Sequence, residues 1–76
     1  MNYGQPRRPT TSVTIDGKNV QVGNWVSFKS DIEQSGRVTA IYTDGTLDLE
    51  NPNGFDGGYI GGDRETTVHK SDCWCE

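Results

Sequence analysis

The sequence predicts an all-β fold, a small barrel of five to six short antiparallel strands with one long glycine-rich loop. Short runs of alternating apolar residues are separated by tight-turn pairs, Asp16-Gly17 and Asp44-Gly45. No segment keeps a helical period over several turns. Residues 51–63 hold five of the ten glycines, which predicts a long loop there.

The first elements are an arm and a hairpin. Residues 1–11 contain Pro6 and Pro9 and almost no apolar side chain, so we expect a flexible basic arm ahead of one domain at 12–76. In the stretch SVTIDGKNVQV, apolar residues alternate on both sides of Asp16-Gly17. This predicts a hairpin whose core-facing residues are Val13, Ile15, Val20 and Val22.

The next strand covers GNWVSFKS. Alternation places Val26 and Phe28 toward the core and Trp25 and Ser27 on the opposite face. We expect residues 31–35 to form an irregular turn. Ser30 and Glu33 match a helix capping box there, although Gly36 leaves room for one helical turn at most.

The second half of the chain continues this pattern. GRVTAIYT is rich in β-branched and aromatic residues and predicts a strand. After Asp44-Gly45, Leu47 and Leu49 face inward. Beyond the glycine-rich loop, RETTVHK predicts a short strand with Val68 inward. SDCWCE is expected to be a closing turn with Trp74 folded onto the core.

The order of these elements over roughly residues 20–74 resembles the SH3-like small barrels, and it is similar to their KOW-type members. The KOW pattern G-x-V-x-x-I occurs as Gly36, Val38 and Ile41. A β-bulge between Val38 and Ile41 would let both side chains face the core. The chain also resembles small proteins of unassigned activity carried by tailed bacteriophages of marine bacteria. The two resemblances imply a compact β-domain that binds nucleic acid or ribosomal partners, or that acts as a phage accessory protein.

Composition limits the function classes. The chain has 76 residues and a net charge of −4, and its first eleven residues carry only the positive charges of Arg7 and Arg8. The acidic remainder would repel phosphate backbones. No apolar run approaches the roughly 20 residues of a membrane span, and we expect no signal peptide. With two cysteines and no disulfide framework, we expect a protein of the cytoplasm (the host cytoplasm if phage-encoded), as a monomer or weak homo-oligomer.

The glycine-rich loop does not fit a phosphate cradle, because no lysine or helix follows it and Asp56 and Asp63 would repel an anion. Two interpretations remain open. Phe55, Tyr59 and Ile60 could pin the loop to the domain, or the loop could present its aromatic side chains to a partner.

Aromatic and acidic residues suggest a protein-binding surface. Exposed Trp and Tyr side chains commonly anchor protein partners. Alternatively, Trp25 covers one end of the barrel. The residues expected to contact a partner are Trp25, Asp31, Glu33, Tyr42, Phe55 and Tyr59.

Two other kinds of site are alternatives. A KOW-type nucleic-acid surface would use Arg7, Arg8, Lys29 and Arg37. A zinc site stapling the C-terminus would use His69, Asp72, Cys73 and Cys75, although Cys-x-Cys spacing is less usual than Cys-x-x-Cys. The ordinary interpretation of the second cluster is a closing turn with incidental thiols.

Catalysis has the least support, since the chain has one histidine and none of the common nucleophile or metalloprotease motifs. We therefore expect a non-enzymatic module without a cofactor. Its expected function is to bind a protein as an accessory or regulatory domain, with a host or virion protein as partner if the phage resemblance holds.

Overall fold

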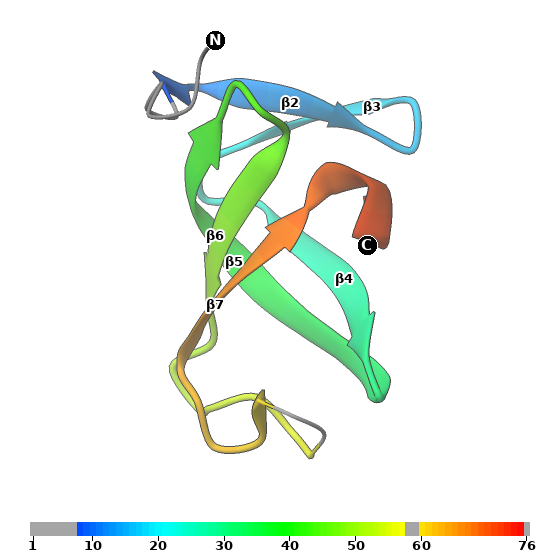
Figure 1. Ribbon diagram of the computed structural model, residues 1–76, viewed down its shortest axis with the longest axis vertical. Helices are drawn as coiled ribbons and strands as arrows, with labels where there is room; N and C mark the ends of the chain where they lie inside the picture. Colours follow the sequence, from blue (N-terminus) through cyan, green and yellow to red (C-terminus); the bar gives the residue numbers. More distant parts are fainter. Residues whose placement is uncertain (1–7, 58–59, 76) are drawn as a thin grey trace, which may run out of the picture.

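The computed structural model describes residues 8–57 and 60–75, and these residues form an all-β domain (Figure 1). Four strands follow one another as an antiparallel meander, β4 (Trp25–Ser30), β5 (Ile32–Tyr42), β6 (Thr46–Glu50) and β7 (Glu65–His69). A 3₁₀ turn, η2 (Lys70–Asp72), then leads into β8 (Cys73–Cys75), which pairs with β4. The all-β class predicted from the sequence is confirmed.

The main sheet has the strand order β7-β6-β5-β4-β8, and β1 (Pro9–Thr10) pairs beside it with the end of β5. The hairpin of β2 (Ser12–Ile15) and β3 (Lys18–Gln21) forms a separate two-stranded sheet. In Figure 1 this hairpin lies across one end of the main sheet. The sheet does not close into a complete barrel, because β7 and β8 are the two ends of its ladder and only η2 connects them.

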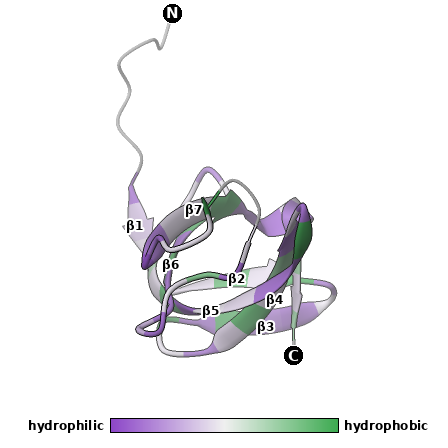
Figure 2. Cartoon of the chain, turned by 90° about the horizontal axis from the view of Figure 1, so that it is seen from below, coloured by the Kyte–Doolittle hydropathy of each residue, from purple (hydrophilic) through white to green (hydrophobic). Residues whose placement is uncertain are grey.

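The core lies inside the curve of the main sheet, under the β2–β3 hairpin. Figure 2 shows the strands bent around this common interior. Phe28 and Phe55 meet edge to face there, with ring centroids 5.6 Å apart. The buried apolar residues are Ile15, Val20, Val26, Phe28, Val38, Ile41, Leu47, Leu49, Phe55 and Cys73.

The bulge predicted within β5 is confirmed. Val38 pairs with Leu49, and the next pair along the ladder joins Ala40 to Asp48. Thr39 is therefore the extra residue, and both Val38 and Ile41 are buried. An added residue restores the inward direction that strict alternation would have lost.

Both predicted Asp-Gly turns are confirmed. Asp16 and Gly17 have φ angles of 54° and 78°, the two positive values that a type I′ hairpin turn needs. At the second turn, the N–H of Gly45 donates to the carbonyl of Tyr42 at 3.0 Å, and Gly45 has φ of 94°.

The irregular turn expected over residues 31–35 is wrong. β5 already begins at Ile32, and Asp31, with φ of 67°, forms the tip of a tight hairpin between Ser30 and Ile32. Pairing with β4 therefore prevails over the local capping-box signal. The strand pattern of β5 was hidden because the inward residue Gln34 is polar, while Ile32, on the same side of the strand, lies at the hairpin tip and is 46% exposed.

Three expectations at the ends of elements also need correction. Val22 is exposed, because β3 ends at Gln21 and the chain turns at Gly23. Cys73, not Trp74, enters the core, since the CWC segment is a strand paired with β4 rather than a turn. Within the arm expected over residues 1–11, Pro9–Thr10 form β1, whereas residues 1–7 lie outside the described residues.

Within residues 8–57 and 60–75, we find no helix long and apolar enough to cross a membrane.

Candidate functional site

Two tryptophans lie on the outer face of the β4–β8 ladder. Trp25 is 44% exposed, and alternation along β4 turns it away from the buried Val26. Trp74 pairs directly with Ser27, which has the same outward direction as Trp25. Diagonal neighbours on one face of an antiparallel pair lie roughly 7–8 Å apart, within reach of aromatic side chains. The ladder therefore brings both tryptophans of the chain together.

Ser27 lies between these indoles. It faces outward but is only 5% exposed, because larger side chains flank it on the same face. We call the surface made by Trp25, Ser27 and Trp74 the tryptophan face.

Charged residues border the tryptophan face. Lys29 pairs with Glu33 across β4 and β5, and Trp25 pairs with Arg37. Arg37 also forms a salt bridge with Glu50 of β6. Trp25 also lines a hollow of about 380 Å³, whose other lining residues are Lys18, Asn19, Val20, Asn24 and Cys75. The face thus has an apolar centre, a charged border and an adjoining hollow.

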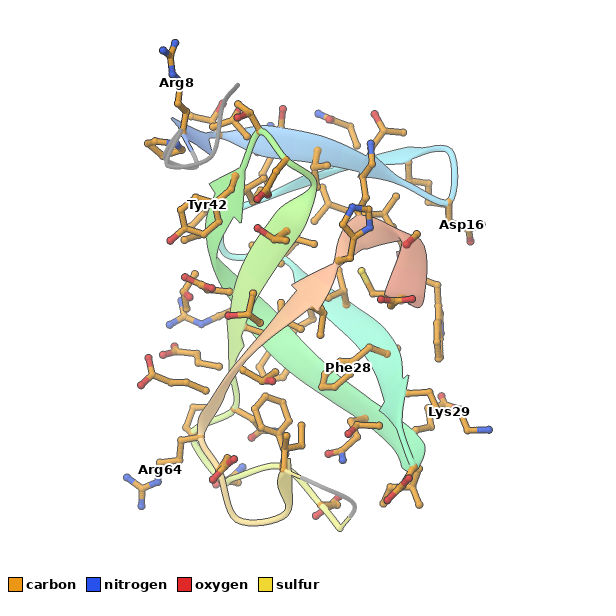
Figure 3. The ribbon with its side chains drawn as sticks, in the orientation of Figure 1. Arg8, Asp16, Phe28, Lys29, Tyr42 and Arg64 are labelled. Carbon is orange, nitrogen blue, oxygen red and sulfur yellow. The ribbon has the colours of Figure 1, made fainter. Side chains whose placement is uncertain are left out.

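The other residues expected to bind a protein are dispersed. Asp31 is exposed at the tip of the β4–β5 hairpin, and Glu33 borders the tryptophan face. Tyr42 lies at the far end of β5, where its hydroxyl donates to Asp48 at 2.9 Å. Figure 3 shows Tyr42 and Lys29 on opposite sides of the molecule. Tyr59 lies outside the described residues.

Phe55 is not available as a partner contact in this structure. It is only 3% exposed and packs on Phe28 inside the core. The expectation of an exposed anchor is therefore wrong for Phe55. The alternative expectation, that Phe55, Tyr59 and Ile60 pin the glycine-rich loop, is confirmed for Phe55 and Ile60, because both pack against the core.

Polar contacts hold the same loop against β5. The buried Gln34 accepts a hydrogen bond from the N–H of Asp56 at 2.8 Å through its side-chain oxygen. Asn51 donates from its side-chain amide to the carbonyl of Ser35 at 3.3 Å. At the base of the loop, the N–H of Phe55 donates to the carbonyl of Asp63. The described part of the loop is thus a packed structural element.

The four candidate zinc ligands do not converge. His69 Nδ1 lies 2.8 Å from the hydroxyl oxygen of Ser71, whereas Cys73 faces the core. Cys75 directs its Sγ toward the carbonyl of Ile15. Among the residues whose positions are described, no three His, Cys, Asp or Glu side chains are grouped so that they could hold a metal ion.

The basic residues expected at a nucleic-acid surface do not form one patch either. Arg8 and Lys29 lie at opposite ends of the molecule (Figure 3). Arg37 is engaged by Glu50, and Lys29 pairs with Glu33. Arg7 lies outside the described residues.

Sequence reasoning missed Trp74 as a surface residue. The signal was present in Cys73-Trp74-Cys75, where two small apolar residues alternate with one large aromatic residue. Assigned as a strand, this pattern turns the two thiols inward and the indole outward.

Comparisons with models of protein families, with curated proteins and with solved structures found no match.

Proposed function

We propose that this protein is a non-enzymatic protein-binding module that acts as an accessory or regulatory domain through its tryptophan face. The observation that carries the proposal is the pairing of Trp74 with Ser27, which sets Trp74 beside the 44% exposed Trp25 on one face. The SH3-like resemblance described above agrees with a binding role and belongs to the same proposal.

Protein interfaces have a characteristic composition. Interface centres are enriched in aromatic residues and depleted in charged ones, while their borders are polar. Tryptophan is among the residues whose truncation weakens binding most. The tryptophan face has this layout, with Lys29, Glu33 and Arg37 around two indoles. The hollow beside Trp25 gives a partner side chain a place to insert.

Protein is favoured over nucleic acid as the partner for an electrostatic reason. The basic residues that border the face each have an acidic neighbour, Glu50 for Arg37 and Glu33 for Lys29. The whole chain carries a net charge of −4. Such a surface attracts phosphate backbones weakly, so binding through it depends on contacts between side chains.

The test is the substitution Trp25→Ala. We expect it to remove the partner that wild-type protein retains, because loss of an aromatic anchor typically costs about 2 kcal/mol or more of binding free energy. Stability should change by at most about 1 kcal/mol, since Trp25 is exposed. Affinity capture with cross-linking from bacterial and phage-infected lysates, with and without nuclease, provides the measurement.

Val22→Ala is the matched control, because Val22 is also exposed and apolar but belongs to the turn after β3. It should retain the partner. A partner retained equally by Trp25→Ala would refute the tryptophan face as the binding site. Partners that disappear on nuclease treatment would instead support the nucleic-acid alternative.

A further inference from the structure

A second surface lies at the edge strand β7. The N–H of Asn51 donates to the carbonyl of Arg64 at 2.9 Å, and the N–H of Lys70 donates to the carbonyl of Gly45 at 2.7 Å. Both bonds continue the β6–β7 register. Hydrogen-bonded pairs alternate along an antiparallel ladder, so every second residue of β7 directs its backbone away from β6. These outward residues are Glu65, Thr67 and His69.

The outward edge of β7 is open to pairing. β7 ends the strand order of the main sheet, and no described strand pairs with its second edge. It is five residues long, contains no proline and pairs with β6 without a bulge, so among the common devices that protect sheet edges it carries a charged side chain, Glu65, but neither proline nor bulge. The carbonyl of His69 is in contact with Cys73 Sγ at 3.6 Å. Among residues 8–57 and 60–75, no hydrogen bond is recorded at the outward backbone groups of Glu65 and Thr67.

On the inner side, this edge borders a groove of about 390 Å³ between β7 and β4. Phe28, Ile60 and Val68 supply its apolar lining, and Figure 3 shows the Phe28 ring between the two strands. Lys29 and Ser30 stand on the β4 side. An apolar side chain projecting inward from a neighbouring strand would therefore be covered.

On the outer side, the edge borders a hollow of about 300 Å³ that is acidic. Asp48 and Glu65 line it together with Thr39, Thr66 and Thr67. Asp48 accepts hydrogen bonds from Tyr42 and Thr67. In the described part of the chain, neither Asp48 nor Glu65 has a cation within salt-bridge distance. A basic side chain projecting outward from a neighbouring strand would meet both carboxylates.

We propose that β7 binds an extended segment of a partner protein by strand addition, and that this segment alternates apolar and basic residues. Alternate side chains of a strand point to opposite faces of the sheet. The apolar set would enter the groove over Phe28, and the basic set would face Asp48 and Glu65. Backbone hydrogen bonds to Glu65 and Thr67 would supply affinity, as in other complexes formed by strand addition.

A second copy of this chain fits the same edge poorly. In the antiparallel register that pairs all of β7 with itself, Thr67 faces Thr67, and Arg64 of each copy faces Lys70 of the other. These two like-charged pairs oppose self-association. A partner segment with lysines opposite Glu65 has no such repulsion.

The test uses the synthetic peptide acetyl-Thr-Lys-Val-Lys-Val-Lys-Thr-amide and the full chain. Thr67→Pro removes one outward N–H and the side-chain hydrogen bond from Thr67 to Asp48, but no backbone hydrogen bond to β6. It should weaken peptide affinity by roughly tenfold or more. Thr67→Ala loses the same side-chain hydrogen bond but keeps that N–H, and it should still bind. Fluorescence anisotropy measures affinity, and amide hydrogen exchange should show new protection at Thr67 while Thr66 and Val68 are already protected by β6.

Two peptide variants keep the test decisive if Thr67→Pro fails to fold. Methylation of alternate peptide nitrogens should abolish binding, because it removes donors to the β7 edge. Replacement of the lysines by glutamates should abolish it as well, because of Asp48 and Glu65. The proposal is overturned if the original peptide does not bind, if the methylated or acidic peptides bind equally well, or if the protein instead dimerises through β7. These outcomes do not involve Trp25, so they are independent of the tryptophan face.

Discussion

Gly36 and Cys73 show how single residues position larger parts of this fold. A Cβ at Gly36 would lie 3.1 Å from Leu49 Cβ and 3.2 Å from Phe55 Cε1. The absence of a side chain thus lets Phe55 bring the glycine-rich loop against β5. Cys73 fills the core where β8 meets β4, and burial, then the neighbouring Asp72 and Cys75, raise the pKa of its thiol to about 11 from the ordinary 9.0.

The raised pKa of Cys73 predicts a pH dependence of stability. Below pH 9.0 the thiol is protonated in both the folded and unfolded chains, so its full contribution is present. Between 9.0 and about 11 the unfolded chain loses this proton while the folded chain keeps it. The free energy of unfolding should therefore fall across this interval.

Urea unfolding of wild type and Cys73→Ala over this pH range measures the effect. The variant is expected to be less stable throughout, because it loses a buried side chain, but its stability should fall less steeply with pH. Contributions that the two proteins share cancel in this comparison. Equal slopes in the two proteins would contradict the assignment to Cys73.

At the scale of elements, the β4–β5 hairpin organises the candidate site and the loop together. Outward residues of these strands border the tryptophan face, and the inward Gln34 holds the glycine-rich loop through the N–H of Asp56. Strand β5 therefore contributes Arg37 to the border of the tryptophan face, and its opposite side holds the glycine-rich loop through Gln34.

The substitution Gln34→Leu tests this attachment. It keeps the side-chain volume but leaves the N–H of Asp56 without its acceptor, so we expect a loss of about 1–2 kcal/mol in stability. The amide of Asp56 should also exchange faster with solvent. Chemical denaturation and hydrogen exchange give the two readouts.

Glu33→Ala serves as the control for Gln34→Leu, because Glu33 is the neighbouring outward residue and makes no contact with the loop that the structure records. Its stability should change by no more than about 0.5 kcal/mol. Unchanged exchange of the Asp56 amide in Gln34→Leu would show that Phe55, Ile60 and Asn51 retain the loop without Gln34.

For the whole molecule, the C-terminal strand completes the fold. The sheet ladder is open between β7 and β8, and the segment 73–75 returns the chain to β4 and places Cys73 in the core. Cys75 also directs its thiol to the carbonyl of Ile15 in the β2–β3 hairpin, at 3.6 Å. The end of the chain therefore joins the two sheets.

Deletion of residues 73–76 is expected to abolish cooperative unfolding. A domain of this size has a margin of roughly 3–5 kcal/mol, and the deletion removes a core residue and a ladder together. Near-ultraviolet circular dichroism during a thermal melt measures cooperativity. A truncated chain that melts cooperatively near the wild-type temperature would show that β8 is dispensable.

Several parts of the fold follow from local sequence. The turns at Asp16-Gly17 and Asp44-Gly45, the inward faces of β4 and β6, and the bulge beside Val38 were all predicted correctly. The outward position of Trp25 was predicted as well. The hairpin at Asp31 was not, because the inward residue of its strand is the polar Gln34 and the apolar Ile32, on the same side, is exposed at the tip.

The sequence by itself determined the β class, the turn chemistry and the direction of most side chains, because these depend on neighbours one to three positions away. Only the tertiary structure decided which strands pair, because pairing is a long-range choice made by packing. The return of β8 to β4 set Trp74 beside Trp25, and the open end of the ladder left β7 unpaired among the described strands. Both candidate surfaces depend on that topology. The tryptophan face lies where β8 pairs with β4, and the second surface lies at the edge of β7 with which no described strand pairs.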